Sequence, residues 1–297
     1  MNPERAAIGN IDRRRETRRE LSPTMANAYE KARNEVLSNP DYAILESDFA
    51  EVYSADTIAE DVALTERLEK KFESNQTPQE ANAKKIADTL EAIVLMQSEM
   101  SNWLGDATTL KASRYDDFVN KTDMLAEWHS PEDGSRILAL AVDVTFGKAT
   151  MEKKLQAIKD EIDSGKLGSI KYFKDERGDF IGKRNNVPRL VIGMSQPVVE
   201  DLARLWLNND TKALAAHPAQ RVILDEIYIQ LSAMLEYANR TGKPEAAMAY
   251  KQALATIQPV YRARMHIDSG ALKQDPVRTE LVATARNYFG TPEKKAA

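Results

Sequence analysis

The spacing of apolar residues changes twice along this 297-residue chain. From residue 23 to residue 104, apolar side chains recur every three or four positions, which predicts amphipathic helices. The pairs Ser22-Pro23 and Thr77-Pro78 are typical helix starts. From residue 195 onward the helical spacing returns. Prolines near the starts and glycines near the ends predict four more helices, at about 197–208, 218–241, 244–265 and 276–289.

Between these helical regions the apolar period shortens to that of β-strands. Short apolar or alternating segments bounded by turn residues predict five strands, at 108–114, 122–128, 136–145, 169–173 and 189–194. A helix is expected over 148–166, with the apolar stripe Met151, Leu155, Ile158 and Ile162 on one face. The segment 174–188 is polar and partly basic, and its length favours a functional loop.

This order predicts an α/β core inside an α-rich chain. We interpret residues 1–22 as a charged flexible arm, 23–77 as N-terminal helices, 78–194 as the α/β core and 195–297 as a C-terminal helical region. The arginines of the arm could contact phosphates, but we favour a solvated helical extension, because basic clusters of this kind are common.

Two aspartates interrupt apolar segments at the same predicted end of the sheet. The segment "HSPEDGS" predicts a hairpin turn centred near residue 132. In such a hairpin Asp123 opposes Ala141, and Asp143 lies one diagonal step away on the same face. A one-residue slip would separate the two acids, and either aspartate alone could simply end a strand. As a pair, they need a cation or a shared proton.

Composition narrows the chemistry of such a site. The chain has no cysteine and only three histidines, which are far apart in sequence, so carboxylates remain as the metal ligands and favour Mg²⁺ or Mn²⁺. A formal net charge of −5 gives no overall nucleic-acid signature. No apolar run approaches the ~20 residues of a membrane span. We therefore expect a cytoplasmic protein without a membrane partner.

The element order and the two acids together resemble the PD-(D/E)XK nuclease superfamily. The likeness covers about residues 78–194, in the order helix–strand–strand–strand–helix–strand, with Asp123 opening the second strand and "DVT" ending the third. The resemblance implies Asp123 and Asp143 as metal ligands and catalytic residues in the cleavage of nucleic acid. Thr145 stands where the family has a lysine. The "DVTFG" and "IKYF" segments also look like those of bacterial proteins, a likeness that implies no activity.

Other residues could complete such a site. Lys154 lies on the apolar stripe of its helix, where it could replace the family lysine or simply cover the core with its stem; Lys171 is a second candidate. Counting back along the preceding helix favours Glu91 over Glu99 as the family's helical glutamate. We expect phosphate contacts from three residues on and beside the polar loop, Lys183, Arg184 and Arg189.

Two other functions fit the same sequence. Thr145, the negative charge and the large helical fraction favour a catalytically inactive nuclease-fold protein that binds or scaffolds. An assembly protein built mainly on the helices would instead leave apolar helical faces exposed in the monomer. In either case the helical flanks could form a homo-oligomer interface.

Overall fold

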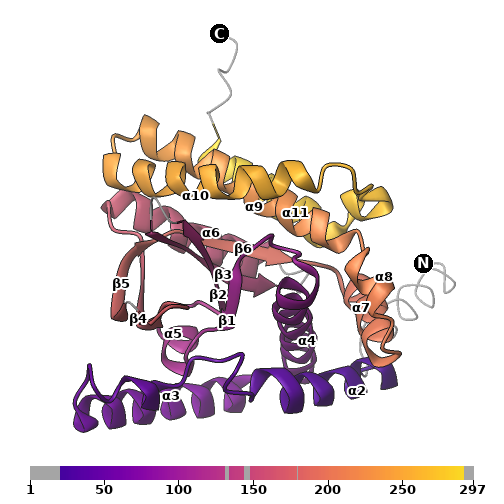
Figure 1. The fold of residues 1–297 in the computed structure, drawn as a ribbon, viewed down its shortest axis with the longest axis horizontal. Helices are drawn as coiled ribbons and strands as arrows, with labels where there is room; N and C mark the ends of the chain where they lie inside the picture. Colours follow the sequence, from indigo (N-terminus) through magenta and orange to yellow (C-terminus); the bar gives the residue numbers. More distant parts are fainter. Residues whose placement is uncertain (1–20, 131–133, 144–147, 179, 291–297) are drawn as a thin grey trace, which may run out of the picture.

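The computed structural model describes residues 21–130, 134–143, 148–178 and 180–290 of the chain. Three layers are visible in Figure 1: N-terminal helices, a central β-structure, and C-terminal helices. The helices are α2 (Pro23–Ala32), α3 (Ala55–Asn75), α4 (Pro78–Ser101), α5 (Arg114–Phe118), α6 (Lys148–Ser164), α7 (Gln196–Leu207), α8 (Thr211–Ala215), α9 (Ala219–Arg240), α10 (Pro244–Ala263) and α11 (Pro276–Phe289). The strands are β1 (Thr108–Lys111), β2 (Met124–Ser130), β3 (Gly134–Asp143), β4 (Gly168–Lys174), β5 (Ile181–Val187) and β6 (Arg189–Gly193).

The predicted start of α4 is confirmed, and its end lies earlier than the sequence indicates. Thr77 accepts a hydrogen bond from the Glu80 N–H, and the Glu80 carboxylate accepts one from the Thr77 N–H. This capping box satisfies two backbone donors that the first helical turn leaves free. The helix ends at Ser101, because Asn102 adopts the left-handed conformation (φ 54°). Gly105 lies in the turn that follows.

A four-stranded sheet forms the centre of the molecule, in the order β1-β2-β3-β6. The first three strands are antiparallel, and β6 runs parallel to β3. The β2–β3 register pairs Met124 with Leu140 and Ser130 with Gly134, so each pair is equidistant from residue 132. The predicted hairpin register is therefore confirmed. One further step along it places Asp123, just before β2, opposite Ala141.

The segment 174–188 was wrongly predicted as a loop throughout, because nearly half of it is strand β5 (Ile181–Val187). This strand pairs antiparallel with β4 in a separate two-stranded sheet. Its exposed side chains are polar, including Lys183, Asn185 and Asn186, so the sequence carries little apolar signal. Pairing with β4 compensates for the weak strand propensity of these residues.

Asp116 holds the small sheet against the rest of the protein. Its carboxylate is fully buried and accepts hydrogen bonds from two successive backbone N–H groups, Lys171 (2.8 Å) and Tyr172 (3.0 Å). It also accepts a hydrogen bond from the Ser113 hydroxyl, at 2.7 Å. Asp116 therefore has a structural role, since it anchors a strand as well as a turn.

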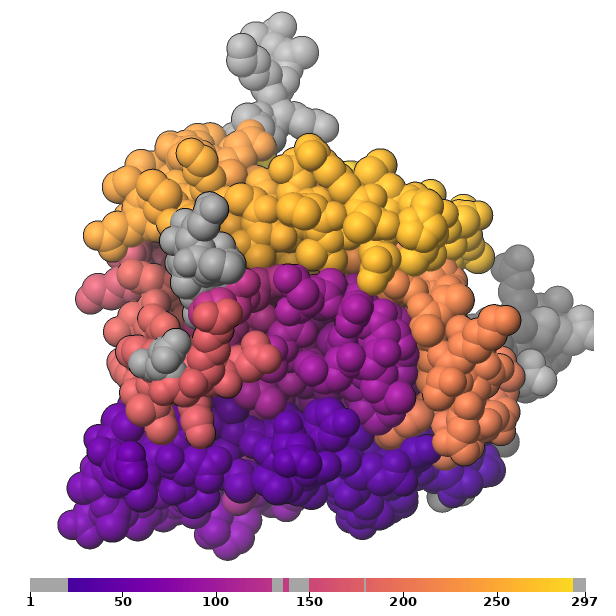
Figure 2. Space-filling view, viewed as in Figure 1, coloured from indigo at the N-terminus to yellow at the C-terminus, as the bar shows by residue number. Residues whose placement is uncertain are grey.

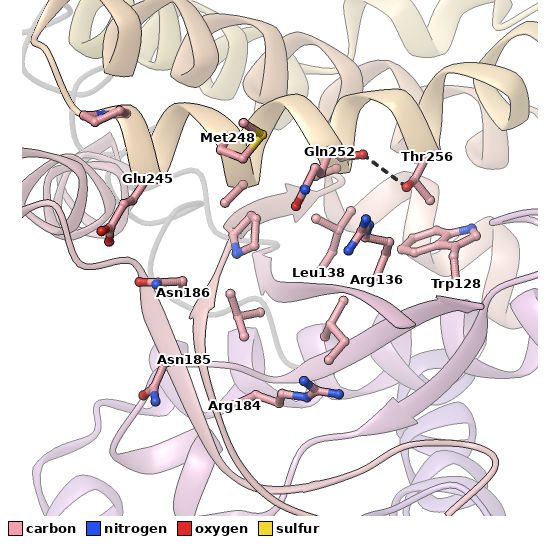
Figure 3. A pocket seen from close by; sticks show the side chains of 16 residues that line it. Trp128, Arg136, Leu138, Arg184, Asn185, Asn186, Glu245, Met248, Gln252 and Thr256 are labelled. Carbon is pink, nitrogen blue, oxygen red and sulfur yellow. Dashed lines mark hydrogen bonds between the residues drawn. The ribbon is translucent and has the colours of Figure 1, made fainter. Parts of the chain in front are cut away.

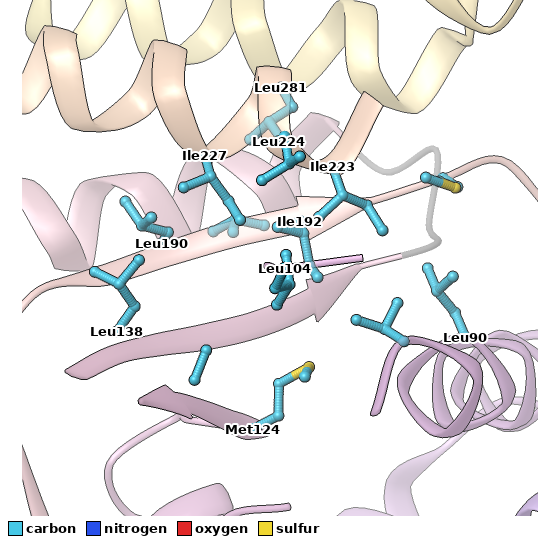
Figure 4. Packing of buried hydrophobic residues seen from close by; sticks show 14 of the residues in the cluster. Leu90, Leu104, Met124, Leu138, Leu190, Ile192, Ile223, Leu224, Ile227 and Leu281 are labelled. Atoms are coloured by element: carbon cyan, nitrogen blue, oxygen red, sulfur yellow. The ribbon is translucent and has the colours of Figure 1, made fainter. Parts of the chain in front are cut away.

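Both faces of the central sheet are covered by apolar side chains. Met124, Ala126 and Leu138 belong to one cluster, whereas Leu125 belongs to a second cluster with Tyr172 and Phe173. This is the period-two alternation of a strand buried on both faces. Figure 4 shows the larger cluster, where side chains of α9 and α11 descend onto β6 and β3. That cluster includes residues from Met25 to Phe289, so the N-terminal helices, the sheet and the C-terminal helices share one core.

The outer edge of β6 is closed by two side chains of α9. The Gln230 amide accepts a hydrogen bond from the Val191 N–H (3.1 Å) and donates one to the Val191 carbonyl (2.6 Å). One helical turn earlier, the Glu226 carboxylate accepts a hydrogen bond from the Gly193 N–H, at 3.1 Å. These contacts satisfy edge groups that would otherwise be buried without partners.

The chain is thus a predominantly helical α/β protein. In Figure 2 the C-terminal helices (yellow and orange) and the N-terminal helices (indigo) lie on either side of the central segments (magenta). Within the described ranges, no helix is both long enough and apolar enough to cross a membrane.

Candidate functional site at the α4–β1–α5 corner

A cluster of charged side chains lies where α4, the end of β1, α5 and the start of β2 meet. Glu91 comes from the middle of α4, Lys111 is the last residue of β1, and Asp117 lies on α5. Asp123 directly precedes β2 and interacts electrostatically with all three. We call Glu91, Lys111, Asp117 and Asp123 the acidic corner.

Local structure explains why these side chains meet. Thr109 and Lys111 are two residues apart on β1, so they face the same side of the sheet. Thr109 donates its backbone N–H to Glu99 (2.7 Å) near the end of α4, and Lys111 reaches Glu91 two turns earlier. The helix and strand therefore run antiparallel. A cap from Ser113 to the Asp116 N–H then starts α5, which carries Asp117.

Lys111 is the centre of the acidic corner. Its Nζ atom lies 2.9 Å from Glu91 Oε1 and 3.9 Å from Asp117 Oδ2. The Lys111 side chain is 17% exposed, and that of Glu91 is 4% exposed. A nearly buried ammonium thus contacts two carboxyl groups, with Asp123 as a third nearby acid.

Burial and repulsion between neighbouring carboxylates raise the pKa values of Glu91 and Asp117. Burial raises the pKa of Glu91 to about 8, and the negative charge of Asp123 adds to this. Burial also raises the pKa of Asp117 to about 6, again with a contribution from Asp123. Burial alone would lower the pKa of Lys111, but the surrounding carboxylates outweigh it and raise that pKa. Lys111 therefore stays cationic, and added positive charge near the corner would favour ionisation of Glu91 and Asp117.

The structure brings Glu91 and Asp123 together, as the sequence analysis expected. Asp143 ends β3, where its backbone pairs with Gly193 of β6. The side chain of Asp143 lies outside the described residues, as does Thr145 entirely. Because Asp123 opposes Ala141 by register, the start of β2 and the end of β3 lie at the same end of the sheet.

The two predicted lysines, Lys154 and Lys171, differ in their surroundings. Lys154 is half-buried on α6, whose apolar stripe is buried as predicted. Lys171 forms an ion pair with Asp61 and lies 4.8–5.6 Å from the ring centres of three tyrosines, Tyr53, Tyr115 and Tyr172. These contacts give Lys171 a structural role on β4. The lysine that contacts Glu91 is Lys111, which the sequence analysis did not select.

The three residues expected to contact phosphate differ in their exposure and in their partners. Lys183 is exposed on β5, and Arg184 lies beside the ring of Phe180. Arg189 is buried on β6, where its guanidinium binds Glu161 (2.6 Å) and the Asn120 carbonyl (3.1 Å). Since its side chain is only 8% exposed, we do not retain Arg189 as a phosphate contact.

Asp117 also belongs to the corner, although we did not select it as a site residue from the sequence. Side chains alternate between the two faces of β1, and Lys111 lies on the face that packs on α4. A lysine buried there needs an acid opposite it, which is the sequence signal that could have indicated the charge cluster. That signal becomes specific only when the helix and strand directions are known.

By charge, the acidic corner suits a hard cation, because it offers carboxylate oxygens in excess over ammonium groups. Among the described residues, however, no group of three or more His, Cys, Asp or Glu side chains is arranged to hold a metal ion. A complete ligand set would therefore need Asp143 or water.

Comparisons with protein-family models, with curated proteins and with solved structures found no match to this chain.

Proposed function

We propose that this chain is a metal-dependent, nuclease-like protein that cleaves phosphodiester bonds in nucleic acid at the acidic corner. One observation carries the proposal: Glu91 on α4, Lys111 on β1 and Asp123 before β2 form one charged cluster, at the sheet end where β3 finishes with Asp143. The order of α4, β1, β2, β3, α6 and β6 supports it, because it follows the PD-(D/E)XK pattern expected from sequence. The β4–β5 hairpin is an insertion in that pattern.

Three residues of the corner, together with Asp143, have distinct roles in this proposal. Asp123 and Asp143 would hold Mg²⁺ or Mn²⁺, and the bound ion would polarise the phosphate and acidify a water molecule. Lys111 would stabilise the negative charge that develops on the phosphate, a role we assign to it in place of Lys154. Glu91 would orient the Lys111 ammonium through their 2.9 Å contact. Lys183, exposed on β5, remains a candidate phosphate contact.

A second function is favoured by the same ion pair. Because Lys111 already contacts Glu91 directly, the corner could be a structural remnant in a nuclease-fold protein that only binds or scaffolds. Such a protein would keep the charge cluster but would bind no divalent ion there.

The proposal is tested by incubating the protein with Mn²⁺ and, separately, supercoiled DNA, single-stranded DNA and RNA. We expect the wild type to cleave at least one substrate and Asp123→Asn and Asp143→Asn to lose about 100-fold or more of that rate. The exposed acid Asp41 supplies a matched control, since Asp41→Asn should cleave like the wild type. If no substrate is cleaved, or if all three variants behave alike, the proposal is wrong.

A further inference from the structure

A groove runs along α10 where that helix crosses the hairpin end of the central sheet. It contains a cavity of about 570 Å³, bounded by β3, the end of β5 and the first turns of α10. A neighbouring cavity of about 380 Å³ continues it toward the end of α10. The two cavities share four lining residues, Trp128, Arg136, Gln252 and Thr256. Together they form the α10 groove, part of which is drawn in Figure 3.

The groove exists because two strands diverge there. The parallel ladder between β3 and β6 begins at Ala139 and Arg189. The preceding residue, Pro188, has no backbone N–H, so the ladder cannot continue toward β5. Strand β5 therefore leaves β3, and α10 covers the fork between them. A cleft fixed by a proline and by two strands is preformed, as most small-molecule sites are.

The lining of the larger cavity is mainly apolar, with a few polar groups that converge on it. Trp128, Leu138, Val187 and Ala253 are buried side chains that contribute its walls. Figure 3 shows Arg136 beneath Gln252 and Thr256 of α10, with Arg184 on the opposite side of the cavity. A volume of several hundred Å³ with such a lining suits a small amphipathic ligand.

Arg184 is the residue that indicates an acidic ligand. Its guanidinium carbon lies 3.8 Å from the ring centre of Phe180 and 5.5 Å from that of Phe173, so two rings hold the group in place. No ion pair with a carboxylate is found for Arg184 among the described residues. Its Nε atom is buried and has no hydrogen-bond partner. A guanidinium fixed at a cavity wall with an unused donor is suited to a planar anion.

A second buried nitrogen in the groove also lacks a hydrogen-bond partner. His129 lines the smaller cavity, and its Nδ1 atom is buried without a hydrogen-bond partner. The two acids of the groove are separated from each other, since Glu245 lines only the larger cavity and Asp106 only the smaller one. Arg136 lines both cavities.

We propose that the α10 groove binds an amphipathic anion, a ligand with a flat apolar body and one acidic group. The apolar body would lie against Trp128, Leu138 and Ala253, and the acidic group would bind Arg184. This inference does not depend on the proposed nuclease function, because the groove is at the opposite end of β2 from the acidic corner. Five residues of strand separate Asp123 from Trp128, about 17 Å.

The test uses 8-anilinonaphthalene-1-sulfonate, an aromatic anion, and its uncharged relative N-phenyl-1-naphthylamine, in buffer containing EDTA. Fluorescence titration of the wild type should give one saturable site for the anion. Arg184→Gln should weaken binding of the anion about ten-fold, as expected for loss of a charge-assisted hydrogen bond, and leave binding of the uncharged probe unchanged. Arg262, exposed on the same helix and outside the groove, provides the control Arg262→Gln, which should bind like the wild type.

A second variant checks the position of the apolar body. Ala253→Phe should weaken both probes, because the larger side chain fills the cavity; circular dichroism confirms that the variant is folded. The proposal is overturned if the wild type shows no saturable site, or if Arg184→Gln and Arg262→Gln bind the anion equally. Because EDTA removes divalent ions, failure here leaves the nuclease proposal untouched, and the reverse also holds.

Discussion

Glu91 and Glu226 are two buried glutamates on helices that pack against the same sheet, and burial raises the pKa of both. Their surroundings differ. Glu91 contacts an ammonium and lies near two further acids, whereas Glu226 accepts one backbone hydrogen bond and has a second oxygen, Oε1, without a partner. Burial therefore favours the neutral, protonated form of Glu226. The acidic corner retains a charged lysine and surplus acids, which is the arrangement expected of a cation site.

The largest loss of stability is expected from Lys111→Met, because this substitution leaves three clustered acids without their ammonium. Removing one partner of a buried ion pair costs about 3–5 kcal/mol of unfolding free energy, measurable by urea denaturation. Adding Glu91→Gln to this variant should recover part of the loss, since it removes one of the unpaired acids. Lys70→Met, at an exposed position of α3, is the control. Equal losses in Lys111→Met and Lys70→Met would show that the corner is not a coupled charge cluster.

A somewhat smaller loss of stability is expected near Glu226, where Gln230 closes the edge of β6. Gln230→Met keeps the side-chain volume but leaves the N–H and C=O of Val191 without their partner. Two buried unsatisfied groups should cost about 2–4 kcal/mol, read from the urea midpoint. Ser232→Ala, two residues along α9, removes only a local bond to the Tyr228 carbonyl and should cost far less. A Gln230→Met variant as stable as Ser232→Ala would contradict the edge-closing role.

The pH dependence of stability tests the raised pKa of Glu226. Above pH 4.5 the unfolded Glu226 carboxyl loses its proton while the buried one keeps it, so stability falls as pH rises toward the folded pKa. Asp225 and Asp275 reinforce this shift, and Arg278 opposes it. Glu226→Gln keeps an acceptor for Gly193 and should therefore weaken the loss of stability between pH 5 and pH 8. An unchanged slope in urea titrations at the two pH values would exclude protonated Glu226.

The smallest change in stability is expected from breaking a solvent-exposed ion pair. Glu30 and Arg33 form a 2.7 Å pair one helical turn apart, with both side chains 54% exposed. Solvent screens such a pair, so Arg33→Gln should change stability by less than about 0.5 kcal/mol in urea denaturation. A cost comparable to that of Lys111→Met would mean that burial is not what distinguishes the acidic corner.

Much of the fold follows from local patterns in the sequence. Proline starts and glycine stops locate the long helices, and the turn "HSPEDGS" fixes the β2–β3 register because side chains alternate strictly along strands. Strand β5 escaped prediction because its exposed positions are polar and its pairing partner, not its own residues, makes it a strand.

The candidate site was predictable only in part. Counting along the helix and strand located Glu91 near Asp123, because both elements have fixed rises per residue. Lys111 and Asp117 were missed because their roles depend on which strand face packs on α4. The burial of Arg189 depends on Glu161, 28 residues earlier in the chain, and no local pattern reports such a pair.

The central claim, that the acidic corner holds a divalent ion, is tested most directly by Mn²⁺ titration, with the free ion followed by electron paramagnetic resonance. We predict one bound ion per chain at pH 8 and weaker binding at pH 6, because Asp117 and Glu91, whose pKa values are raised to about 6 and about 8, are more protonated at the lower pH and then contribute less negative charge to the corner. Asp123→Asn should abolish binding, and Asp41→Asn should not. The claim is contradicted if the wild type binds no Mn²⁺, or if Asp123→Asn binds it as well as Asp41→Asn does.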